Sequence, residues 1–133
     1  MRDGRTRKLS ISDQETSSDN VLANHRFSLV VLSGASPGDE IHLGEPRKIV
    51  GRGPSVDISV PDAAMSRQHF SLELAGETFR VRDLGSTNGV VVNGKTIESA
   101  DLKHGDRLKA GDHVFQFLVE QVESQPRTYI VPD

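Results

Sequence analysis

The chain has 133 residues, no cysteine, and 16 Lys and Arg against 19 Asp and Glu, which gives a formal net charge of −3. This length suits one domain with a modest core, and the charge argues against nucleic acid as the main partner. Without cysteine there are no disulfides, thiolate nucleophiles or thiolate-rich metal sites. The sequence also has no signal-peptide segment and no apolar run of roughly 20 residues, so we expect no membrane contact and a cytoplasmic location.

The two ends of the chain differ in composition from its middle. Residues 1–25 are rich in Ser, Asp, Arg, Asn and Gln, and their few apolar residues show no sustained period. Such a segment buries too little apolar surface to offset the entropy of ordering it, so we predict a disordered N-terminal tail. Residues 123–133 carry two prolines and are predicted to be a C-terminal tail or linker. The predicted domain is therefore 26–122.

Short apolar-alternating runs, separated by turn residues, fill this domain. The predicted strands are 27–32, 41–43, 48–51, 58–60, 69–74, 79–82, 90–92, 95–97, 106–109 and 113–119. No stretch keeps a helical period over ten residues, and 100–103 is predicted to be at most one helical turn. Many short strands with frequent turns predict an all-β sandwich of two antiparallel or mixed sheets.

Two hairpins are predicted in this sandwich, and each fixes the register of the two strands that it joins. The runs 69–74 and 79–82 alternate cleanly around a short turn. Their candidate core residues are Phe70, Leu72, Leu74, Phe79 and Val81. The pair Asn93-Gly94 between two short strands favours the positive φ angles of a type I′ turn.

Four polar clusters stand where predicted strands give way to turns, which is the layout of a site built from loops at one end of a β scaffold. They are Val50-Gly51-Arg52-Gly53, Met65-Ser66-Arg67-Gln68-His69, Asp83-Leu84-Gly85-Ser86-Thr87-Asn88-Gly89 and Val92-Asn93-Gly94. In this order they resemble the Gly-Arg, Ser-Arg-x-His, Ser-Thr-Asn-Gly and Asn-Gly blocks of the forkhead-associated (FHA) domain. The resemblance runs from about residue 26 to about residue 122. It implies an FHA-type β-sandwich that binds phosphothreonine through loops at one end.

A phosphothreonine phosphate carries about −1.5 to −2 charges near pH 7 and has three strong acceptor oxygens. The guanidinium of Arg52 offers paired donors that match it, and the flanking Gly51 and Gly53 allow the backbone to turn tightly. The resemblance implies that Arg52 and Ser66 contact the phosphate and that Arg67 is a second contact to phosphate or peptide. From the residues alone, a surface arginine and a turn serine remain alternatives.

Two further residues are implied to touch the ligand. An asparagine amide can accept from one peptide N–H and donate to a carbonyl, so the resemblance assigns Asn88 to the ligand's main chain. It places Thr87 near the phosphothreonine. A tight turn is the alternative for both residues, and the two roles are compatible.

Other residues of the motifs are expected to support the site without touching the ligand. The resemblance makes His69 structural, with its ring bonded to loop backbone, and it is not expected to be catalytic. The remaining supporting residues are Gly51, Gly89, Asn93 and Gly94.

The implied function is phosphothreonine-dependent protein–protein interaction in Ser/Thr kinase signalling. No cofactor is expected. The partners are a phosphothreonine-containing protein or peptide and an upstream kinase. The alternative is a phosphate-independent scaffold, or an interaction module of a larger regulator such as a transcriptional regulator or a secretion component. Catalysis is not expected, because Ser66 lies in no G-x-S-x-G elbow and Gly51 begins no phosphate-binding loop. The five histidines lack metal-ligand spacing, so no metal is expected either.

The tail offers one candidate phosphorylation site. Thr16, in Gln14-Glu15-Thr16-Ser17-Ser18, lies in a segment similar to the Glu-Thr-Thr-Ser tail of small bacterial FHA regulators, which a Ser/Thr kinase phosphorylates. In those regulators the phosphorylated tail closes the domain's own site. The hypothesis is that phosphorylated Thr16 does the same here, favoured by the high effective concentration of a tethered ligand. The alternative is an unmodified tail.

Overall fold

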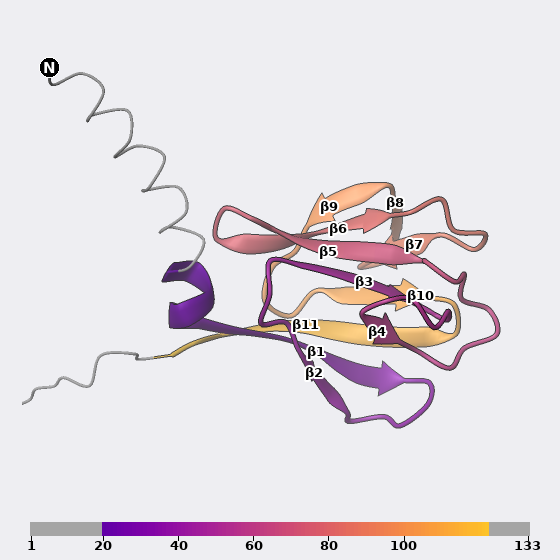
Figure 1. The fold of residues 1–133 in the computed structure, drawn as a ribbon, viewed down its shortest axis with the longest axis horizontal. Helices are drawn as coiled ribbons and strands as arrows, with labels where there is room; N and C mark the ends of the chain where they lie inside the picture. Colours follow the sequence, from indigo (N-terminus) through magenta and orange to yellow (C-terminus); the bar gives the residue numbers. More distant parts are fainter. Residues whose placement is uncertain (1–19, 123–133) are drawn as a thin grey trace, which may run out of the picture.

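The computed structural model describes residues 20–122, which form two β-sheets packed face to face (Figure 1). In chain order the strands are β1 (His25–Ser33), β2 (Glu40–His42), β3 (Arg47–Gly51), β4 (Ile58–Ser59), β5 (Phe70–Ala75), β6 (Thr78–Asp83), β7 (Val90–Val92), β8 (Lys95–Ile97), β9 (Ser99–Asp101), β10 (Arg107–Ala110) and β11 (His113–Gln121). The six-stranded sheet has the order β2-β1-β11-β10-β7-β8, and the five-stranded sheet has the order β4-β3-β5-β6-β9. All pairs of the six-stranded sheet are antiparallel, and β3–β4 is the one parallel pair of the five-stranded sheet, which confirms the predicted sandwich of antiparallel and mixed sheets.

Aromatic side chains from both sheets join across the core. Phe27 on β1 packs edge to face on Phe79 of β6, with ring centroids 4.9 Å apart, and Phe117 of β11 lies against both rings. Edge-to-face pairs of this kind stabilise a core beyond the apolar area that they bury. The predicted core residues of the β5–β6 hairpin are buried, except that Leu74 is only partly buried.

One strand was missed by the sequence reading. Residues 99–101 form β9, paired with β6, where a helical turn was predicted for 100–103. An uncovered β6 would present unpaired backbone groups at the sheet edge, and β9 satisfies them. Leu102, just after β9, is buried, and its N–H donates to the Phe79 carbonyl at 2.8 Å, which fixes this segment on the sheet.

The end of the predicted N-terminal tail also differs. Residues 20–24 form a helical turn directly before β1, and the side chain of Val21 is buried in the core. The Val122 N–H donates to the Asn24 carbonyl at 2.8 Å, so the turn is tied to the end of β11. No helix within residues 20–122 is long and apolar enough to cross a membrane. Residues 1–19, with Thr16, and residues 123–133 lie outside the described part of the chain.

The sandwich has two distinct ends along its strands (Figure 1). The helical turn 20–24 lies at one end, beside the start of β1 and the end of β11. The loops that follow β3, β4, β6 and β10 lie at the opposite end. The polar clusters 52–53, 62–69 and 84–89 therefore belong to the same end of the molecule.

Candidate functional site

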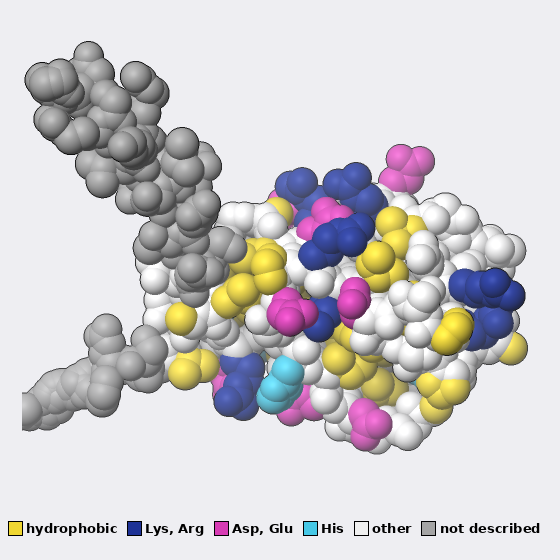
Figure 2. Space-filling model, in the orientation of Figure 1, with side chains coloured by type: hydrophobic (Ala, Val, Ile, Leu, Met, Phe, Trp, Pro, Cys, Tyr) yellow, Lys and Arg dark blue, Asp and Glu magenta, His cyan; other side chains and the backbone are white. Residues whose placement is uncertain are grey.

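The loops after β3, β4 and β6 surround a shallow hollow of about 360 Å³. It is lined by Arg52, Ala63, Ala64, Met65, Ser66, Arg67, Thr87 and Asn88. The structure thus brings together all of the residues predicted to contact a ligand. Figure 2 shows one group of Lys and Arg side chains at this end of the molecule, apart from a larger group over the β5–β6 side.

The loop after β3 is held against the backbone of residues 66–67. The Arg52 N–H donates to the Ser66 carbonyl at 2.9 Å, and the Gly53 N–H donates to the Arg67 carbonyl at 3.1 Å. A Cβ atom on Gly51 would overlap the carbonyl oxygen of Arg67. Neither Gly51 nor Gly53 has a positive φ. The chain bends at residues 52–53 without a positive φ, and Gly51 is needed there because two backbone segments meet.

Arg52 is oriented by this same segment. Its Nε–H donates to the Met65 carbonyl at 2.9 Å, and within residues 20–122 its two terminal nitrogens have no protein partner. Both Arg52 and Arg67 lack a carboxylate within 4 Å in this part of the chain, whereas Arg80 is paired with Asp101 at 2.8 Å. The hollow therefore holds uncompensated positive charge, which favours an anion.

Ser66 and Asn88 are fixed by contacts between the two loops. The Ser66 Oγ accepts from the Thr87 N–H at 3.1 Å, which leaves the hydroxyl hydrogen free to be donated to a ligand. The Asn88 Nδ2 donates to the Ala64 carbonyl at 2.7 Å, which leaves its Oδ1 as an acceptor. The site therefore offers a cation, a hydroxyl donor and an amide acceptor on adjacent loops.

His69 is completely buried beneath these loops. Its Nδ1 accepts from the Ser66 N–H at 2.9 Å, so the ring proton lies on Nε2, which donates to the Gly89 carbonyl at 2.8 Å. Gly89 has φ 81° and donates its N–H to the Ser86 Oγ. Because both nitrogens of His69 bind backbone, the ring ties the 66–69 segment to the turn before β7.

Asn93 and Gly94 lie away from the hollow. They form the β7–β8 turn with φ 50° and 86°, which agrees with the predicted type I′ turn. The Asn93 side chain accepts from the Arg107 N–H and donates to the Asp106 carboxylate, each at 2.9 Å. Asn93 thus stabilises the start of β10, and neither Asn93 nor Gly94 lines the hollow.

Sequence reasoning missed Asp62 and His113, which form a buried pair behind the hollow. Their side chains are 2% and 4% exposed, and Oδ2 of Asp62 lies 2.7 Å from Nδ1 of His113. Burial acts to raise the pKa of Asp62, but hydrogen bonds from His113 and from the N–H groups of Ala64 and Asp112 outweigh it, so the pKa lies below its ordinary value. No local signal links these residues, because 51 positions separate them.

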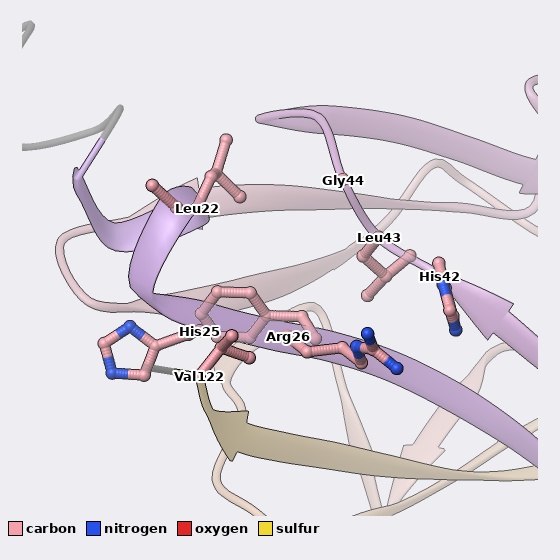
Figure 3. A pocket seen from close by; sticks show the side chains of 9 residues that line it. Leu22, His25, Arg26, His42, Leu43, Gly44 and Val122 are labelled. Carbon is pink, nitrogen blue, oxygen red and sulfur yellow. The ribbon is translucent and has the colours of Figure 1, made fainter. Parts of the chain in front are cut away.

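A second hollow, of about 260 Å³, lies at the opposite end of the sandwich (Figure 3). Leu22, Leu43 and Val122 line it together with Arg26 and His42. None of the predicted ligand contacts belongs to it. It is therefore separate from the site formed by the loops.

Comparison with known proteins is consistent with this geometry. The sequence pattern of the FHA domain matches residues 48–111. The glycogen accumulation regulator GarA of Mycolicibacterium smegmatis is 39% identical over 90 residues, which cover 68% of this chain and 57% of that protein, so the match spans little more than half of GarA. The oxoglutarate dehydrogenase inhibitor of Corynebacterium efficiens is 35% identical over 77% of this chain and 72% of that protein. A solved FHA domain studied for phosphothreonine-dependent interactions is 28% identical, with a TM-score of 0.64, over 70% of this chain and 95% of that chain.

The close approach at Gly51 gives a stability prediction. Gly51→Ala places its Cβ against the Arg67 carbonyl, so the two backbone segments must separate, and overpacking of this kind costs about 1–3 kcal/mol in the free energy of unfolding. Gly44→Ala is the matched control, because a Cβ there meets nothing within 4 Å and its φ is not positive. Urea unfolding of both variants measures the difference. Equal stability of the two variants would contradict the close approach.

Proposed function

Because this chain belongs to the forkhead-associated domain family, we propose that it is a phosphothreonine-dependent interaction module of Ser/Thr kinase signalling. The observation that carries the proposal is the convergence of Arg52, Ser66 and Asn88 on one hollow at the loop end. The solved FHA domain similar to this chain, studied for phosphothreonine-dependent interactions, supports the same ligand class.

Each side chain of the hollow has a distinct task in this proposal. The free terminal nitrogens of Arg52 and the hydroxyl of Ser66 bind the phosphate oxygens, and the exposed Arg67 adds charge beside them. The Asn88 Oδ1 accepts an N–H of the bound peptide, with Thr87 next to the phosphothreonine. Because the loops already hold these groups in place, little conformational entropy is lost on binding.

We also propose that the chain has no catalytic activity and acts in the cytoplasm. Both nitrogens of His69 bind backbone groups, so the ring has no free base to offer to Ser66. Two relatives are named as a regulator of glycogen accumulation and an inhibitor of oxoglutarate dehydrogenase, which supports a regulatory role in metabolism. By this proposal the partner is a phosphothreonine-containing protein, with a Ser/Thr kinase upstream.

A phosphate-independent scaffold is the rival to this function. A scaffold of that kind would gain nothing from an arginine whose charge faces no carboxylate within the described residues. The uncompensated charge in the hollow therefore favours a phosphate-dependent module over a phosphate-independent scaffold.

The reach of the chain limits how Thr16 can act. The 20–24 turn lies at the end opposite the loops, and β1, with nine residues, spans about 27 Å of the distance between the two ends. Thr16 is four residues before Asn20 and reaches at most about 14 Å from it. While the 20–24 turn stays folded, phosphorylated Thr16 therefore falls short of its own hollow. We propose that it binds the hollow of a second molecule.

The first functional test is peptide binding. The best phosphothreonine peptide of a library is expected to bind with micromolar affinity, about −8 kcal/mol, by fluorescence anisotropy. Arg52→Ala removes a charge-assisted contact of about 1.5–3 kcal/mol and, because the other contacts depend on how Arg52 places the phosphate, should abolish detectable binding. Arg80→Ala, outside the hollow, should leave the affinity unchanged. Binding that survives phosphatase treatment of the peptide would support the scaffold instead.

Phosphorylation of Thr16 gives a second test. Sedimentation of the phosphorylated chain should show association that increases with concentration, since the ligand on one molecule occupies the hollow of another. Arg52→Ala should return it to the monomer. A phosphorylated chain that stays monomeric while the amide signals of Arg52 and Asn88 shift would instead mean that the tail closes its own site.

A further inference from the structure

We propose that Asp62 and His113 are positioning residues of the phosphothreonine site: Asp62 closes the turn whose carbonyls aim Arg52 and Asn88, and His113 holds Asp62 in place. This inference rests on the proposed function and deepens it. Neither residue lines the hollow, so both act through the residues that do.

The turn that begins at Asp62 supplies the acceptors for both ligand-binding side chains. The Asp62 Oδ1 accepts from the Ala64 N–H at 2.8 Å, and the Asp62 carbonyl accepts from the Met65 N–H at 3.0 Å. The next carbonyls, of Ala64 and Met65, then accept from Asn88 Nδ2 and Arg52 Nε. The Asp62 carboxylate thus sets the direction of the two carbonyls that accept hydrogen bonds from the Asn88 amide and the Arg52 guanidinium.

His113 connects Asp62 to two other loops of the same end. The Ala35 N–H donates to Nε2 of His113 at 3.0 Å, so the ring proton lies on Nδ1 and is donated to the Asp62 Oδ2. The same oxygen accepts from the Asp112 N–H at 2.7 Å. The carboxylate is therefore clamped between the β10–β11 turn and a ring that rests on the β1–β2 loop.

Two glycines make room for this pair. A Cβ atom on Gly111 would stand 2.7 Å from the Asp62 Oδ2, and a Cβ on Gly34 would stand 2.5 Å from the His113 ring. Both glycines also have positive φ, at 60° and 125°. A larger residue at either glycine would therefore press against the pair and adopt a strained backbone conformation.

The hydrogen-bond roles allow each contact of His113 to be removed separately. In His113→Asn, the side-chain nitrogen takes the position of Nδ1 and still donates to Asp62, while the contact to Ala35 is lost. In His113→Gln, the longer amide reaches the position of Nε2 and accepts from Ala35, while the contact to Asp62 is lost. Asp62→Asn places an N–H₂ group opposite N–H donors at one of its two positions, so one of its acceptor contacts fails.

The test compares these variants by phosphothreonine-peptide affinity and by the NMR signals of Arg52 Nε–H and Asn88 Nδ2–H₂ without ligand. His113→Gln and Asp62→Asn should weaken binding about tenfold or more, as expected for an unmatched buried hydrogen bond, and should shift both signals. His113→Asn should bind within about twofold of the unaltered chain and leave both signals in place. Val21→Ala, which loses core packing at the opposite end, should lower the melting temperature without changing affinity or signals.

Equal effects of His113→Asn and His113→Gln, or unchanged binding by Asp62→Asn, would overturn the positioning role. Should Asp62→Asn fail to fold, the two His113 variants decide the question alone. If the chain binds no phosphothreonine peptide, but the Arg52 and Asn88 signals shift in the variants as expected, the proposed function is contradicted and the positioning role is supported. If the two signals do not shift in His113→Gln, the positioning role is contradicted, whatever the affinity for the phosphothreonine peptide.

Discussion

The site depends on one physical constraint, which is the close approach of residues 64–67 to the end of β3. A side chain at Gly51 would exclude that backbone, and its absence lets the N–H groups of Arg52 and Gly53 bond to it. From the other side, His69 bonds to the same segment, and Asn88 bonds to its first carbonyl. The segment is therefore fixed by folding, and a ligand meets donors that are already in place.

The arrangement of charge follows from this constraint. The carbonyl that accepts from the Arg52 Nε is neutral, so it orients the guanidinium without cancelling its charge. Within residues 20–122 the one buried carboxylate is that of Asp62, which lies behind the hollow and accepts hydrogen bonds from His113 and from two backbone N–H groups. The structure thus directs its acidic group inward and its positive charge outward, which suits a doubly charged phosphate.

Much of the fold and of the hollow was predictable from local sequence, because strand alternation and turn residues act over short distances. The β5–β6 hairpin and the Asn93-Gly94 turn follow from such patterns. β9 was missed because its three residues give no alternation, and its pairing is decided by the open edge of β6. The Asp62–His113 pair and the role of Gly51 depend on contacts between distant segments, which no single-sequence pattern contains. The burial of Val21 likewise depends on the finished core.

The most direct test of the loop-end phosphothreonine site is an NMR titration of the chain with a phosphothreonine peptide, followed through the backbone amides. The largest shifts should fall on residues 52–53, 64–67 and 86–89, and the unphosphorylated peptide should produce none of them. Shifts concentrated around Leu22, His42 and Val122, which line the hollow at the opposite end, would contradict it.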